Sequence, residues 1–108
     1  MSYSIELTDN FKKEAKKLQK KYPSLKSELE ELGSTLSKNP TTGTHLGNSV
    51  YKIRLAIKSK GKGKRSGARV MTLVKIVNEK VYLFSIYNKG EKDNISDREI
   101  QELIKDIS

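Results

Sequence analysis

Two cations alternate along one predicted strand, and a third cation begins the next strand. Lys52 and Arg54 stand two residues apart in a segment, 50–57, whose apolar residues also recur at every second position. Residues two apart share one face of a β-strand, so both cations should lie opposite the apolar side chains. Arg69 can lie beside Arg54 if the two strands form a hairpin. Guanidinium forks bind phosphate oxygens in pairs and ammonium groups act as point charges, so the pattern favours a phosphate-binding surface.

Residues at the end of the last predicted strand would complete this surface. Lys89 and Lys92 follow that strand and would close one edge of the sheet. Tyr87, near the end of the strand, would share the open face and offer a ring on which a base can stack. We therefore expect a concave basic surface on a rigid sheet.

A long stretch without acidic residues surrounds these positions. The 46 residues from Gly33 to Asn78 contain no Asp or Glu but ten Lys or Arg, and five of those ten lie in the glycine-punctuated run 60–69. The formal net charge of the chain is +9, so this stretch alone can account for the excess. Charge this concentrated implies a polyanionic partner, most simply a nucleic acid, although a solvated basic loop is the plainer reading.

The composition excludes several kinds of site. The chain has 108 residues, no Cys and one His, His45, so disulfides, thiolate metal sites and His-rich metal centres are ruled out. We expect no metal and no cofactor, and we interpret His45 as structural.

Residues 1–108 should form a single domain. No apolar run approaches the roughly 20 residues of a membrane span, and the N-terminus does not look like a signal peptide, so we expect a cytoplasmic protein.

Two patterns of helical spacing precede the central strands, and a third follows them. A short strand is expected over 3–7, after which Thr8, Asp9 or Asn10 can cap a helix. Two helices should then form a hairpin that ends before Asn39-Pro40. A capping box at Ser96–Glu99 begins the last helix. The apolar stripes of these three helices are Phe11, Ala15, Leu18 and Tyr22; Leu25, Leu29, Leu32 and Leu36; and Ile100, Leu103, Ile104 and Ile107.

The centre of the chain changes to the period of β-strands. Runs over 50–57, 68–77 and 81–87 read as strands, with a short hairpin connection at 78–80. The element order is therefore β-α-α-β-β-β-α. It predicts an α+β fold: a small, mainly antiparallel sheet with the helical hairpin on one face, together with a C-terminal helix.

These motifs, taken in this order, resemble the RelE/ParE toxin superfamily. The residues that carry the resemblance are VYKIRL over 50–55, GKGKRSGARV over 61–70 and YNKGEKD over 87–93. The loop is most similar to the HigB-like branch. The resemblance covers nearly the whole chain.

The resemblance implies a toxin of a type II toxin–antitoxin system. RelE-like members cut mRNA in the ribosomal A site: the ribose 2′-hydroxyl attacks the adjacent phosphate, and no metal is needed. Lys52, Arg54 and Arg69 match the positions that surround the scissile phosphate, and Lys89 would assist them. Since nearby cations disfavour the protonated ammonium of Lys52, this residue is our candidate general base. Contacts to RNA or the ribosome are expected from Lys58, Lys60, Lys62, Lys64, Arg65, Tyr87 and Lys92.

The resemblance also implies partners, and it leaves alternatives open. The partners would be a cognate antitoxin, in a hetero-oligomer with the toxin, and the 70S ribosome with its mRNA. ParE-like members poison DNA gyrase instead of cutting RNA. The chain has Gly90 where RelE-like proteins often carry an Arg, and it has no Tyr beyond Tyr87. A catalytically silent module that binds RNA or ribosomes is therefore a third hypothesis.

Overall fold

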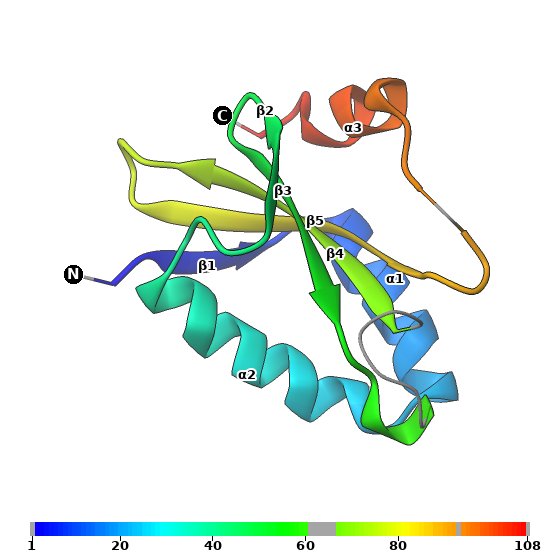
Figure 1. Ribbon diagram of the computed structural model, residues 1–108. Helices are drawn as coiled ribbons and strands as arrows, with labels where there is room; N and C mark the ends of the chain where they lie inside the picture. The colour runs from blue at the N-terminus through cyan, green and yellow to red at the C-terminus, as the bar shows by residue number, and fades with distance from the viewer. Residues whose placement is uncertain (1, 61–66, 93, 108) are drawn as a thin grey trace.

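A computed structural model of the chain describes residues 2–60, 67–92 and 94–107, with only the backbone of Lys60 included. In these ranges the chain forms three α-helices and a five-stranded sheet (Figure 1). One short 3-10 helix ends at Lys60. In chain order the elements are β1 (Ser4–Leu7), α1 (Asp9–Lys21), α2 (Leu25–Lys38), β2 (Thr44–Gly47), β3 (Val50–Leu55), η1 (Lys58–Lys60), β4 (Ala68–Lys75), β5 (Lys80–Asn88) and α3 (Asp97–Ile104).

The sheet has the strand order β1-β5-β4-β3-β2. All neighbouring strands are antiparallel except the outer pair, in which β1 runs parallel to β5. Strand β4 is therefore the central strand, and all its residues except Lys75 are buried. The predicted α+β class and the mainly antiparallel sheet are confirmed.

Strand β2 was not predicted. It is four residues long, none of them is buried, and it pairs with β3 as an edge strand. A tight turn joins the two strands, with positive φ angles at Gly47, Asn48 and Ser49. Because β2 buries no apolar side chain, its sequence lacks the alternation by which the other strands were recognised.

The helical hairpin covers one face of the sheet, as predicted. Phe11, Ala15 and Leu18 of α1 are buried there, together with three leucines of α2. Helix α1 begins where the Thr8 side chain accepts a hydrogen bond from the Phe11 N–H, so Thr8 is the cap among the three candidates. Helix α2 ends at Lys38, just before Asn39-Pro40.

Helix α3 packs on the opposite face and forms a second core (Figure 1). Its capping box is present as predicted: Ser96 accepts from the Glu99 N–H, and the Glu99 side chain accepts from the Ser96 N–H. Ile100 is buried against Met71 and Phe84, and the rest of the apolar stripe packs around them. We expected the face that carries Lys52 and Arg54 to be open, and this expectation must be corrected because α3 covers part of it.

The β4–β5 hairpin turns earlier than predicted. Its turn occupies residues 76–79 instead of 78–80, and Glu79 has a positive φ angle of 52°. Ile76 and Val77, which we placed in the strand, are exposed in this turn. Their β-branched side chains mimic a strand in the sequence, but the ladder pairing ends at Lys75 and Lys80.

Candidate functional site

The cations predicted to do chemistry lie in neighbouring positions of the sheet. Arg54 of β3 pairs with Arg69 of β4, which in turn pairs with Tyr87 of β5. We call these three residues, two arginines and the tyrosine beside them, the cationic row. Lys52 lies two residues along β3 from Arg54, on the same face and opposite Met71. Adjacent strands are about 4.8 Å apart, so the two guanidinium groups project from one small area of rigid backbone.

Arg69 differs from the other cations because it is buried. Only 4% of its surface is exposed, whereas Arg54 is exposed and Lys52 is half-buried. One guanidinium nitrogen, Nη1, donates to the carbonyl of Ala68 at 3.1 Å. Burial lowers the pKa of Arg69, the neighbouring charge of Arg54 lowers it further, and Tyr87 raises it. Arginine keeps its charge well above neutral pH, so the row holds a fixed, partly desolvated positive charge.

A β-bulge places Tyr87 in this row. Met71 pairs with Ser85 but Thr72 pairs with Leu83, so Phe84 is an extra residue in β5. An extra residue reverses the alternation of every following side chain. As a result Phe84 and Tyr87 both join the core under α3, and Ile86 turns to the helical hairpin. Tyr87 is only 6% exposed, so its ring forms a wall of the site more than an open stacking platform.

The two lysines after β5 are held by different neighbours. The backbone N–H of Lys89 donates to the carbonyl of Gly67 at 3.0 Å, which ties the end of β5 to the start of β4. The ammonium of Lys92 lies 2.7 Å from a Glu99 carboxylate oxygen and 5.7 Å from the centre of the Tyr87 ring. That hydrogen bond is the main cause of the lowered pKa of Glu99. Lys92 therefore links α3 to the edge of the cationic row.

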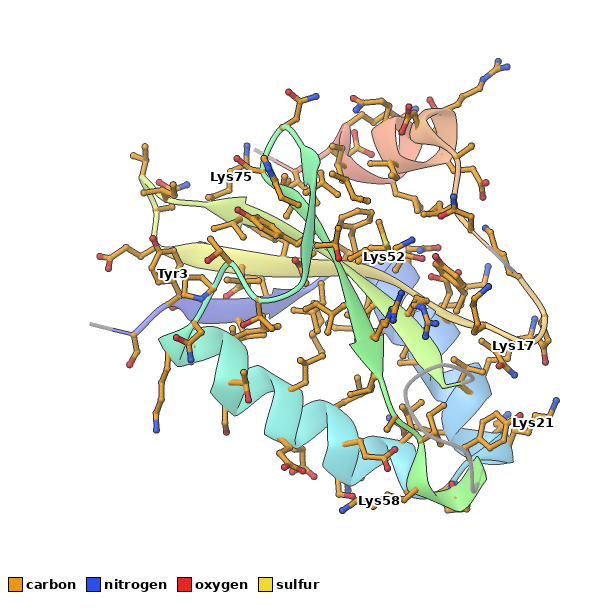
Figure 2. All side chains as sticks on the ribbon, in the orientation of Figure 1. Tyr3, Lys17, Lys21, Lys52, Lys58 and Lys75 are labelled. Atoms are coloured by element: carbon orange, nitrogen blue, oxygen red, sulfur yellow. The ribbon has the colours of Figure 1, made fainter. Side chains whose placement is uncertain are left out.

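The start of the basic loop is anchored to α2. The backbone N–H of Lys58 donates to the buried carboxylate of Glu28 at 2.6 Å. Ser59 and Ser24 share a hydroxyl pair at 2.8 Å, and the Ser59 N–H donates to the Ser24 hydroxyl at 2.9 Å. The Lys58 side chain is exposed near α2, well apart from Lys52 in Figure 2. The Lys60 side chain and Lys62, Lys64 and Arg65 lie outside the described residues.

The far end of the loop is set by a close packing contact. A Cβ on Gly67 would collide with the backbone carbonyl of Leu55, although the φ angle of Gly67 is not in the left-handed region. Only glycine lets β4 begin this close to the end of β3. The sequence suggested that Gly67 merely punctuates a basic run, and its packing role could not be inferred without the strand pairing.

Sequence reasoning missed a hollow beside Tyr87. It measures about 490 Å³ and lies between α1, the end of β5 and the turn that follows. Leu18, Ile86 and Tyr87 contribute apolar walls, and Lys17, Lys21 and Lys92 contribute cations. The sequence does not indicate this hollow, because helical spacing does not show which lysine of α1 meets the end of a distant strand.

His45, which we interpreted as structural, is exposed on the edge strand β2. It pairs with Tyr51 across β2 and β3, and the two ring centres are 4.9 Å apart. Within residues 2–60, 67–92 and 94–107, no group of three or more His, Asp or Glu side chains is arranged to hold a metal ion. In the same ranges no helix combines the length and the apolar character needed to cross a membrane.

One family model matches nearly the whole chain. The family model described as "RelE toxin of RelE / RelB toxin-antitoxin system" matches residues 4–107. This match is to RelE, and the HigB-like branch stays a prediction from the loop sequence. A search of the curated proteins found no match.

Solved structures with the same fold are RelE proteins of low sequence identity. An E. coli RelE toxin with two arginines replaced by alanine, in the free state, has a TM-score of 0.65 and 18% identity, and the match covers 100% of both chains. The isolated E. coli RelE toxin has a TM-score of 0.62 and 19% identity over 99% of this chain and 100% of that one. The toxin–antitoxin complex RelBE2 of Mycobacterium tuberculosis has a TM-score of 0.61 and 15% identity over 82% and 99%.

Proposed function

Because the chain belongs to the RelE family of toxins of toxin–antitoxin systems, we propose that it is a ribosome-dependent endoribonuclease that cuts mRNA without a metal. The observation that best supports this proposal is the cationic row. Arg54 and Arg69 pair across two rigid strands, and Lys52 stands on the same face. Such an arrangement offers preorganised positive charge to a phosphate whose own charge grows during the reaction.

The proposed reaction is an internal transesterification. The ribose 2′-oxygen forms a bond to the adjacent phosphorus, and the bond from phosphorus to the 5′-oxygen of the next nucleotide breaks. The products are a 2′,3′-cyclic phosphate and a 5′-hydroxyl. In this scheme Lys52 removes the proton of the 2′-hydroxyl, and Lys89 supplies a proton to the leaving 5′-oxygen.

Arg54 and Arg69 stabilise the transition state in this scheme. The pentavalent phosphorus carries more negative charge on its non-bridging oxygens than the ground state does, so fixed donors stabilise it preferentially. One such donor is typically worth about 3–4 kcal/mol. Burial of Arg69 adds to the effect, because a charge held away from water interacts more strongly with a nearby phosphate.

We propose two kinds of partner. Lysines of the basic loop, beginning with Lys58, hold the 70S ribosome through its RNA, since a chain of net charge +9 attracts a polyanion. A cognate antitoxin binds the toxin in a hetero-oligomer and presents acidic residues to the basic face. Ribosome binding would supply positioning of the mRNA that a protein of this size does not provide alone.

The function is tested by mapping mRNA 5′ ends after induced expression, and by incubating purified protein with programmed ribosomes. We expect cuts in mRNA on ribosomes, with 5′-hydroxyl ends, and little cutting of naked RNA. A parallel supercoiling assay with DNA gyrase addresses the ParE-like alternative. Inhibited supercoiling with intact mRNA would overturn the proposal, as would salt-sensitive ribosome binding without any cut.

A further inference from the structure

The bulge in β5 decides which side chain enters the cationic row. Tyr82 and Phe84 face α3, so in a regular strand Ile86 would also face α3 and Tyr87 would point into the helical hairpin. The extra residue reverses this order, and Tyr87 comes to lie beside Arg69 instead. The composition of the row therefore depends on a local irregularity, which needs something to hold it in place.

Helix α1 holds the bulge because β1 ends before it. The parallel pairing of β1 with β5 stops at Leu7 and Leu83, which leaves the outer edge of β5 without a neighbouring strand from Phe84 onward. Side chains of α1 replace that strand. The Asn10 amide donates to the carbonyl of Phe84 at 3.0 Å, and the Glu14 carboxylate accepts the N–H of Ile86 at 3.2 Å.

Glu14 collects three donors on a single oxygen. Its Oε1 accepts from the Ser85 hydroxyl at 2.9 Å, the Ile86 N–H at 3.2 Å and the Asn10 amide at 2.9 Å. With Glu14 in place Ser85 is only 2% exposed and Ile86 only 1%, so the carboxylate is the acceptor for both donors. Without the acceptor, a bulged strand would leave a buried N–H and a buried O–H unpaired. The bulged path of β5 would then cost more free energy.

We propose that Glu14 is a positioning residue for the cationic row, acting through the β5 bulge. It keeps Ser85 and Ile86 in the bulged path and thereby keeps Tyr87 beside Arg69. Glu14 does not itself touch the reacting phosphate in this account. The proposal rests on the proposed RNA cleavage for its activity readout, but its structural part stands on hydrogen bonds and register alone.

Three variants separate positioning from simple stability. Glu14→Ala removes the acceptor, whereas Glu14→Gln keeps a carbonyl oxygen that can accept from Ser85 and Ile86. Glu30→Ala on α2 is the matched control, since Glu30 is exposed. Each variant is assayed for mRNA cleavage over a range of programmed-ribosome concentrations, and for its melting temperature. Amide hydrogen exchange at Ile86 and nuclear Overhauser contacts between Tyr87 and Arg69 report the bulge directly.

For Glu14→Ala we expect the rate at saturating ribosomes to fall about tenfold or more, with an unchanged ribosome concentration at half-maximal rate. The Ile86 amide should exchange faster and the contacts between Tyr87 and Arg69 should be lost. Glu14→Gln should recover most of the rate and the contacts, and Glu30→Ala should match the unmodified protein.

Folded Glu14→Ala protein with normal contacts between Tyr87 and Arg69 would overturn the proposal. So would a Glu14→Gln variant as damaged as Glu14→Ala. If Glu14→Ala does not fold, Ser85→Ala removes one donor of the same network and should give the same effects in weaker form. If the unmodified protein cuts no mRNA, the proposed function fails, and the exchange and contact measurements still decide the role of Glu14.

Discussion

The cations on the sheet and the cations on helix α1 have the same charge but different surroundings. Helix α1 carries six lysines, all exposed to solvent: Lys12, Lys13, Lys16, Lys17, Lys20 and Lys21. On the sheet, Arg69 is buried beside Arg54, and Lys52 is half-buried nearby. A solvated lysine must lose side-chain freedom and water before it stabilises a phosphate, and a cation already held by strands has much less to lose. Charge attracts an RNA to either region, but only the sheet offers charge in fixed positions.

The largest expected effect contrasts Arg69 with a lysine of α1. We expect Arg69→Ala to slow cleavage at saturating ribosomes about 10²- to 10³-fold, because it removes a fixed donor to the transition state. Lys13→Ala should leave that rate within about twofold, since Lys13 is exposed and a solvated surface cation contributes little. Single-turnover cleavage measures both rates, and melting curves exclude unfolding. Equal losses in the two variants would remove the distinction between the regions.

A pair of glycine variants sharpens the comparison through the backbone. Gly67→Ala should lower the free energy of unfolding by about 2 kcal/mol, because its Cβ meets the carbonyl of Leu55 where β4 begins. Gly33→Ala, in the middle of α2, has open space and should raise it by up to about 1 kcal/mol. Denaturant titration measures both, and a neutral Gly67→Ala would show that the strand ends can separate. Cleavage should fall only in Gly67→Ala, which displaces Arg69.

A stabilising change in β4 tests whether stability or position governs activity. The hydroxyl of Thr72 is buried and has no hydrogen-bond partner in the described part of the chain. Thr72→Val keeps the shape and removes the unpaired group, so it should raise the free energy of unfolding by about 1 kcal/mol. The rate of cleavage should not change. A Thr72→Val variant less stable than the unmodified protein would reveal a partner for this hydroxyl.

The smallest expected effect concerns the exposed pair that joins α3 to the row. The pKa of Glu99 is lowered in the folded state, mainly by its hydrogen bond to Lys92. The pair therefore contributes stability above the unfolded pKa of Glu, about 4.3, and loses it as the pH falls through the lower folded pKa. Glu99→Gln removes the charge but can keep the capping box. The melting temperatures of the two proteins should differ slightly at pH 6 and converge at low pH; a gap that widens on acidification would contradict this account.

Regular periodicity explains what could be predicted from the sequence. The apolar stripes predicted the helical hairpin and the last helix. The Ser96–Glu99 capping box was recognisable, and Thr8 was one of three candidates for the first cap, because caps use few residue types. The alternation in 50–55 placed Lys52 and Arg54 on one face, opposite the side chains that meet the hairpin. These features depend only on neighbours within one element.

Several features that depend on contacts between distant segments could not be predicted. The β5 bulge has no signature in the sequence, because Phe84 and Ser85 are ordinary strand residues until Glu14 is seen beside them. The same is true of Gly67, whose constraint comes from Leu55. Burial of Arg69 was not predicted either, because we expected the face that carries it to be open. Strand β2 was missed because an exposed edge strand needs no apolar alternation.

The central claim is that cations fixed on the sheet carry the chemistry. The most direct measurement is the single-turnover rate of mRNA cleavage at saturating programmed ribosomes for Arg54→Ala, with Lys13→Ala as control. Arg54 is exposed, so its removal should leave the fold intact. The account predicts a loss of about 10²-fold or more for Arg54→Ala, with an unchanged rate for Lys13→Ala. Cleavage by folded Arg54→Ala at the rate of the unmodified protein would contradict it.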